Sequence, residues 1–120
     1  DLILVDTSIW VDHLRAVDDG LKFALDAGNV FIHPFVIGEV ACGVLPNRAE
    51  VLREMHGLAT APVVTHSELL AFIEERSLMG RGIGYVDIHL LASCALAVDA
   101  VLWTRDRRLA DVAAELLLAL

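Results

Sequence analysis

The stretch LILVDTS, residues 2–8, decides the fold. Its first four residues form a continuous apolar run with β-branched side chains, which is typical of a central strand buried on both faces. A carboxylate follows at Asp6, and hydroxyls follow at Thr7 and Ser8. In open parallel sheets, functional groups gather beyond the carboxyl ends of the strands. The stretch therefore predicts a buried parallel strand with a polar site at its end.

The same pattern returns in AVLWTRD, residues 100–106, where an apolar run ends in Thr104 and Asp106. Between the two stretches, short apolar runs alternate with segments of helical periodicity. This alternation is typical of an α/β fold built on a parallel sheet. The 120 residues have the length of one domain, and we expect a single domain over 1–120.

The periodicity, the caps and the helix breakers predict the individual elements. We expect strands over 2–5, 30–32 and 100–104, and a brief strand or a connection over 62–65. Pro46 and Ser67 are expected to begin helices, and residues 116–120 fit either a helix or a strand. The expected helices cover 7–14, 19–26, 34–43, 46–58, 67–78, 86–98 and 107–117.

The composition indicates a dense core and a partner. Hydrophobic residues make up 57% of the chain, against about 45–50% in typical domains even when glycine is counted. Apolar surface left over by the core would suit a dimer or an obligate complex. No stretch has the ~20 apolar residues of a membrane span. We read Cys42 and Cys94 as reduced core residues of a cytoplasmic protein.

The net charge of −8, with a single lysine, is unusual for a nucleic-acid binder. Such proteins usually carry a basic face, because affinity depends largely on neutralising phosphates. The charge taken alone favours cations, a basic partner, or a site where metal ions neutralise the acids.

Four acids stand out by their positions next to apolar segments. Asp6 and Asp106 follow the two strong strands, Asp87 lies in the first turn of an apolar helix, and Glu39 is the only charge between Asn29 and Arg48. A carboxylate in apolar surroundings is costly unless it is paired or binds metal. Asp6 could alternatively cap a helix, Asp87 could favour a helix dipole and Asp106 could serve in a turn, whereas Glu39 has no such local role.

All four acids map to the carboxyl edge of the expected sheet, so they can converge on one pocket. Clustered carboxylates repel one another and offer hard oxygen ligands, which are what Mg²⁺ and Mn²⁺ prefer. Two such ions can stabilise the attacking and leaving oxygens of a phosphodiester displacement. Thr7, Ser8 and Thr104 could orient the carboxylates or water. Helix capping by Ser8 and strand propensity for Thr104 explain them equally well.

The ordered set of Asp6-Thr7-Ser8, Gly38-Glu39, Asp87 and Thr104-Arg105-Asp106 resembles the PIN domain family, and within it the VapC-type toxins of toxin–antitoxin pairs. The resemblance extends over essentially the whole chain. It implies a three-layer α/β/α sandwich with a central parallel sheet, and Mg²⁺- or Mn²⁺-dependent cleavage of RNA. It also implies a homodimer and a cognate antitoxin that blocks the acidic pocket. The family's acidic positions fall on Asp6, Glu39, Asp87 and Asp106.

On this interpretation Asp6, Asp87 and Asp106 hold the principal metal, and Glu39 helps to hold a second metal or orients water. Arginines near the acids could guide RNA, but ordinary solvated charge explains at least two of the four. We interpret Trp103 as a core residue and Trp10 as a core or partner contact rather than as platforms for bases. The four arginines are Arg81, Arg105, Arg107 and Arg108.

Three other functions fit parts of the pattern. A receiver-like phosphoacceptor domain shares the length and the acidic pocket, but it needs paired acids at the first strand and a lysine after a late strand, and Lys22 is misplaced. A phosphatase of the haloacid type needs a second Asp where Ser8 stands. A non-catalytic acidic interaction module remains open, although the complete acid set argues against it.

Overall fold

The strands form one parallel sheet in which β1 is central. The computed structural model describes residues 2–120, and the sheet has the order β3-β2-β1-β4. The register pairs Leu2 with Ala100 and Val5 with Trp103, so β1 and β4 end side by side. The strands are β1 (Leu2–Val5), β2 (Val30–Ile32), β3 (Ala59–Thr60) and β4 (Ala100–Trp103).

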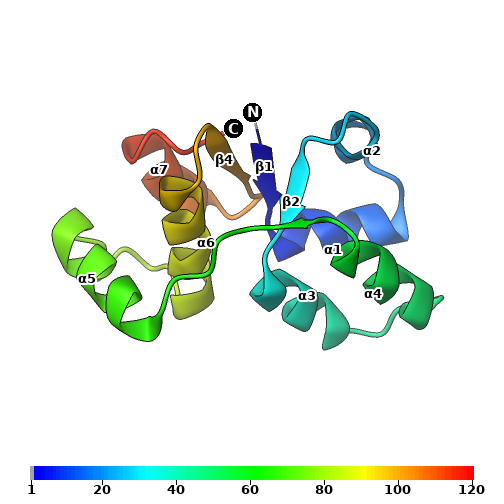
Figure 1. Cartoon of the computed structure of the whole chain (residues 1–120), viewed down its shortest axis with the longest axis horizontal. Helices are drawn as coiled ribbons and strands as arrows, with labels where there is room; N and C mark the ends of the chain where they lie inside the picture. The colour runs from blue at the N-terminus through cyan, green and yellow to red at the C-terminus, as the bar shows by residue number, and fades with distance from the viewer. Residues whose placement is uncertain (1) are drawn as a thin grey trace.

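Within residues 2–120, seven helices complete the three-layer α/β/α sandwich, so the expected fold class is confirmed. In Figure 1, α5, α6 and α7 gather on the side of β4, and α1 to α4 gather on the side of β2. The helices are α1 (Thr7–Arg15), α2 (Asp19–Asp26), α3 (Pro34–Ala41), α4 (Arg48–His56), α5 (His66–Arg76), α6 (Tyr85–Leu96) and α7 (Arg107–Glu115).

The core forms around β1 and α6. Leu4 and Val5 of β1 have no exposed surface, and neither do Leu90 and Leu91 of α6. Every residue from 88 to 94 of α6 is buried, which explains why this helix carries no charge after Asp87. Within residues 2–120, no helix is both long and apolar enough to cross a membrane.

Carboxylates at the carboxyl edge also cap helices. Asp6 accepts from the Thr7 N–H at the start of α1, and Asp106 accepts from the Leu109 N–H at the start of α7. Asp18 caps α2 in the same way. Capping therefore takes place at these sites, and it fixes where the carboxylates lie.

The expected starts of two helices were wrong. Thr65, not Ser67, caps α5, because its hydroxyl and the Glu68 side chain form a reciprocal capping box. The α4 helix begins at Arg48 rather than at Pro46, after Asn47 turns the chain in the left-handed region with φ 53°. Residues 62–65 form a connection, one of the two alternatives expected there, and the short strand β3 lies just before it.

The structure also places both cysteines and residues 116–120, whose sequence fits either a helix or a strand. Ala119 forms a parallel bridge to Leu102 of β4. Cys42 is exposed at the end of α3, so the expectation of a core residue was wrong there. Cys94 is buried as expected, and burial raises the pKa of its thiol to about 12. Both thiols are free.

Candidate active site

Asp6 is the most enclosed of the four predicted acids, with 7% of its surface exposed. Its Oδ1 accepts a hydrogen bond from the Thr7 N–H at 2.7 Å. Its Oδ2 accepts from the Ser8 hydroxyl at 3.1 Å and from the Thr104 hydroxyl at 2.7 Å. Three donors therefore fix the orientation of this carboxylate, and hydrogen bonds to a charged acceptor are stronger than neutral ones.

Asp106 lies beside Asp6 because Thr104 contacts both residues. The Asp106 N–H donates to the Thr104 hydroxyl oxygen at 3.0 Å, while that hydroxyl donates its proton to Asp6. The Asp106 side chain accepts from the Leu109 N–H at 3.1 Å through Oδ1. Asp106 is exposed, so the expectation of apolar surroundings was wrong for this acid. Asp106 caps α7, which begins just after the exposed residues that follow β4.

Glu39 reaches the same edge from α3. Its Oε1 accepts a hydrogen bond of 2.6 Å from the Thr7 hydroxyl. Glu39 is exposed, whereas its neighbours Ile37 and Val40 are buried. The expectation that this acid has apolar surroundings was therefore wrong, because residues adjacent along a helix lie on different faces.

Asp87, in the first turn of α6, is near the other three acids in space. Its Oδ2 accepts from the Gly84 N–H at 3.1 Å. Burial raises the pKa of Asp87, the Gly84 hydrogen bond partly opposes this, and the charges of Asp6, Asp106 and Glu39 raise it further. The carboxylates therefore act on one another electrostatically, although they come from four separate segments of the chain.

The donor set fits hard divalent cations, since it consists of carboxylate and hydroxyl oxygens. Within the described residues, one oxygen each of Glu39, Asp87 and Asp106 accepts no hydrogen bond from the protein. As placed in residues 2–120, no three His, Cys, Asp or Glu side chains lie close enough to form a closed metal site. The helix-capping hydrogen bonds and the contact between Thr7 and Glu39 direct the carboxylates toward their own chain. These side chains would therefore have to rotate to complete a metal site.

Comparison with known proteins identifies the family of the chain. The chain matches the PIN domain family over residues 3–115. The chain belongs to the PIN domain family. It is 48% identical over 114 residues to Ribonuclease VapC32 of Mycobacterium tuberculosis strain CDC 1551 / Oshkosh, a match that covers 95% of this chain and 92% of the relative. The protein of the same name from strain ATCC 25618 / H37Rv matches to the same extent.

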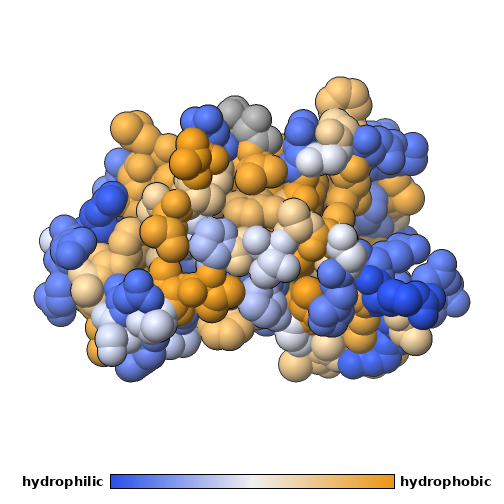
Figure 2. Space-filling model, in the orientation of Figure 1, coloured by the Kyte–Doolittle hydropathy of each residue, from blue (hydrophilic) through white to orange (hydrophobic). Residues whose placement is uncertain are grey.

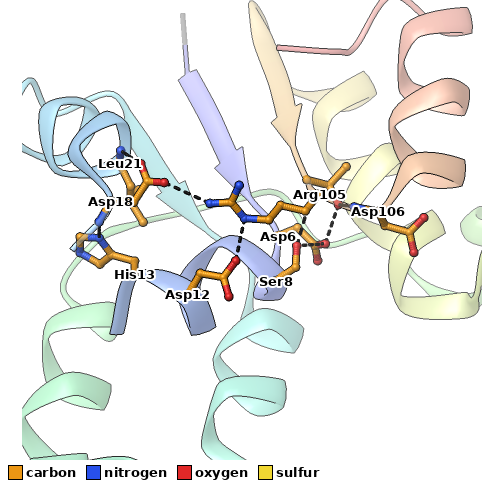
Figure 3. A network of polar contacts seen from close by, with 9 residues as sticks. Asp6, Ser8, Asp12, His13, Asp18, Leu21, Arg105 and Asp106 are labelled. Carbon is orange, nitrogen blue, oxygen red and sulfur yellow. Dashed lines mark hydrogen bonds and ion pairs between the residues drawn. The ribbon is translucent and has the colours of Figure 1, made fainter. Parts of the chain in front are cut away.

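Two of the four arginines near the acids of this PIN domain are paired with other acids. Arg81 binds Glu115 of α7 with both terminal nitrogens. Arg105 binds Asp12 and Asp18 and points away from Asp106 (Figure 3). These two guanidinium groups therefore bind acids outside the predicted set of four.

The other members of the expected set are placed as follows. Arg107 and Arg108 are exposed in the first turn of α7, and the Arg108 side chain folds over Gly82. Trp10 is buried with 4% exposure, and Trp103 is partly buried against the core. Neither indole is therefore free as a platform for bases.

Sequence reasoning missed two features of the described structure. The first is the role of Asp12 as a partner of Arg105, for which no local pattern gives a signal. The second is a buried pair of histidines, His33 and His89, with ring centroids 6.0 Å apart. In the described part of the chain, Nε2 of His33 and both ring nitrogens of His89 have no hydrogen-bond partner. The only signal for this pair in the sequence was His33, which lies next to Pro34 at the end of an expected strand.

Proposed function

We propose that this PIN domain, over residues 1–120, is a metal-dependent endoribonuclease and the toxin of a toxin–antitoxin pair. The observation that carries the proposal is that four carboxylates gather at one edge of the sheet. Thr104 links Asp6 to Asp106, Thr7 links Asp6 to Glu39, and the charges of all three acids act on Asp87. The names of the relatives, which are ribonucleases of the VapC type, support the same activity. The family match also argues against a receiver-like phosphoacceptor.

In the proposed site Asp6, Asp87 and Asp106 hold a principal Mg²⁺ or Mn²⁺, and Glu39 holds a second ion or orients water. When bound, the ions supply Lewis-acid stabilisation of phosphodiester charge and activation of water. Ser8 and Thr104 fix the orientation of Asp6 through its Oδ2. Thr7 contributes its N–H to Asp6 and its hydroxyl to Glu39, so it couples the two acids directly.

RNA has to approach an edge of the molecule rich in acids, on a chain with a net charge of −8. Cations held by the carboxylates would cancel that charge where phosphate approaches. Arg107 and Arg108, which have no ion pair among residues 2–120, are the remaining candidates for guiding the backbone. The same acids would attract a basic side chain of an antitoxin.

Exposed apolar side chains suit the homodimer and the antitoxin of the proposal. Phe23 is 76% exposed and Leu117 is 89% exposed. Figure 2 shows apolar residues spread across the visible face rather than confined to the interior. Such exposed apolar side chains are available for contact with a partner. We place the protein and its partners in the cytoplasm.

The test is cleavage of a mixed RNA substrate with Mg²⁺, with Mn²⁺ and with EDTA, by wild type and Asp6→Asn. The matched control is Glu75→Gln, which removes one exposed charge on α5. We expect cleavage that requires metal, disappears in Asp6→Asn and persists in Glu75→Gln. Equal cleavage by Asp6→Asn would reject the site. Mn²⁺ binding without any cleavage would indicate a non-catalytic interaction module.

A further inference from the structure

Arg105 lies in the chain between Thr104 and Asp106, two residues of the proposed site, and its side chain points away from Asp106. Its Nε lies 2.7 Å from Oδ2 of Asp12 on α1, and its Nη2 lies 3.1 Å from Oδ2 of Asp18 before α2. Its backbone N–H donates to the Ser8 hydroxyl at 3.3 Å. Figure 3 shows the guanidinium between the two acids, with Asp106 directed away from it. Arg105 therefore joins the turn after β4 to α1 and to the N-cap residue of α2.

Asp18, which pairs with Arg105, is itself held in a fixed position by hydrogen bonds. Its Oδ1 accepts from the Leu21 N–H at 3.0 Å, and its own N–H donates to Nδ1 of His13 at 3.0 Å. The Leu21 hydrogen bond lowers the pKa of Asp18, and Arg105 lowers it as well. Asp18 is therefore charged at neutral pH and tied to the chain on both sides.

A second contact docks the same two segments independently of charge. A Cβ on Gly20, in the first turn of α2, would lie 3.3 Å from the ring of Trp103, the last residue of β4. The indole therefore packs closely against the start of α2. Apolar packing at Trp103 and ion pairs at Arg105 together hold the carboxyl end of β4 against α2.

We propose that Arg105 is a positioning residue, which clamps the turn 104–106 to α1 and α2 and so holds Asp106 next to Asp6. This inference rests on the proposed nuclease function and names a further residue on which that function depends. Thr104 and Asp106 flank Arg105 directly. A shift of the turn would therefore displace both residues from Asp6, to which the Thr104 hydroxyl donates. The guanidinium suits the role because its planar fork binds two carboxylates at once.

The competing role for Arg105 is contact with an RNA phosphate. Removal of the Asp12 charge distinguishes this role from the positioning role. If Arg105 served RNA, loss of Asp12 would free its charge and keep or increase RNA affinity. If Arg105 acts as a clamp, loss of Asp12 impairs the site as loss of Arg105 does. Asp12 is the better partner to change, because Asp18 also caps α2.

The experiment compares wild type, Arg105→Ala, Arg105→Lys, Asp12→Asn and the double variant Asp12→Asn/Arg105→Ala. Arg53→Ala, which removes an exposed charge on α4, is the control. Three quantities are measured: kcat and KM for RNA cleavage, the Kd for Mn²⁺ without RNA, and the salt dependence of RNA binding in EDTA. Partners that orient metal ligands typically change metal affinity or activity about 10–100-fold.

We expect each single variant at 105 or 12 to lower kcat and weaken Mn²⁺ binding about tenfold, at the low end of that range. The double variant should be no worse than either single variant, and KM and the salt dependence should stay as in wild type. Lysine should not restore activity, since a compact ammonium on a flexible stem does not reproduce the two-acid fork.

Normal kcat and Mn²⁺ affinity in Asp12→Asn would overturn the inference. So would a decrease of about one in the salt slope of RNA binding for Arg105→Ala, which would assign the residue to a phosphate. If wild type neither bound Mn²⁺ nor cut RNA, the proposed nuclease function itself would fail, and the clamp with it.

Discussion

Thr104 donates its hydroxyl proton to Oδ2 of Asp6 at 2.7 Å, across 98 positions of the chain. The same hydroxyl oxygen accepts the Asp106 N–H at 3.0 Å. One small side chain thus connects the first and the last of the four predicted acids. The contact exists because β1 and β4 end in register, with Val5 opposite Trp103.

The first prediction concerns this hydroxyl. Thr104→Val keeps the shape but removes the donor to Asp6 and the acceptor for Asp106, so we expect kcat to fall about 10–100-fold. Loss of a hydrogen bond to a charged group should also lower the free energy of unfolding by about 1.5–3 kcal/mol. Thr104→Ser keeps the hydroxyl and should retain most activity. RNA cleavage and urea unfolding measure both effects, and wild-type kcat in the valine variant would contradict the assigned contact.

The second prediction concerns Asp87, whose pKa is raised above its ordinary value of 3.8. The folded state therefore binds a proton at Asp87 more tightly than the unfolded state does, so ionised Asp87 costs stability at neutral pH. That cost disappears as the pH falls through the folded pKa toward 3.8. Asp87→Asn should raise the Tm at neutral pH in EDTA and match wild type below 3.8. A lower Tm in the variant at neutral pH would show that the carboxylate is stabilising.

The third prediction is that divalent cations stabilise the wild type. A ligand that binds only the folded state adds RT ln(1 + [L]/Kd), which is about 2.7 kcal/mol at a hundredfold excess over Kd. Urea unfolding with Mn²⁺ and with EDTA measures the difference. Asp6→Asn should lose most of the gain, while Glu75→Gln should keep it. An equal gain in all three proteins would locate the bound ions elsewhere.

The fourth prediction concerns His33, which is fully buried. Burial, with a smaller contribution from His89, lowers the pKa of His33 from 6.5 to about 4. The unfolded chain therefore takes up the proton first, and stability falls as the pH drops from 6.5 to about 4. The full loss is about 3 kcal/mol, at 1.36 kcal/mol for each pKa unit. His33→Asn can still cap α3, and it should show a flatter dependence of unfolding free energy on pH over this window.

The fifth prediction contrasts two glycines. A Cβ on Gly38 of α3 would meet nothing within 4 Å, so Gly38→Ala should stabilise the protein by roughly 0.5–1 kcal/mol. Gly82 has a φ of +78°, and a Cβ there would lie 2.6 Å from the Arg108 guanidinium. Gly82→Ala should destabilise it by about 1–2 kcal/mol, the cost of the left-handed conformation for a residue with a Cβ. Urea unfolding of both variants checks the opposite signs.

The sequence could predict the parts of the site that depend on strand ends. Asp6 and Thr104 each follow an apolar run, and the parallel topology places such positions at one edge. Asp87 was predictable because it precedes a helix segment that is buried throughout. These inferences need only local pattern and the general geometry of α/β sheets.

Other features depend on contacts between distant side chains, which local periodicity does not encode. Arg105 and Asp18 are 87 positions apart, and nothing near either residue in sequence indicates their ion pair. The exposure of Glu39 depends on which face of α3 turns to the core. The choice of Thr65 over Ser67 as a cap depends on the reciprocal bond to Glu68, which competes with an equally plausible start two residues later.

The central pairing of β1 with β4 also has a consequence for the order of synthesis. Asp6, which follows β1, is synthesised 98 positions before Thr104, which follows β4. A nascent chain on the ribosome therefore lacks an assembled carboxylate cluster until β4 has emerged and docked. A ribonuclease built this way would be inert toward the translating RNA around it until these two segments have met.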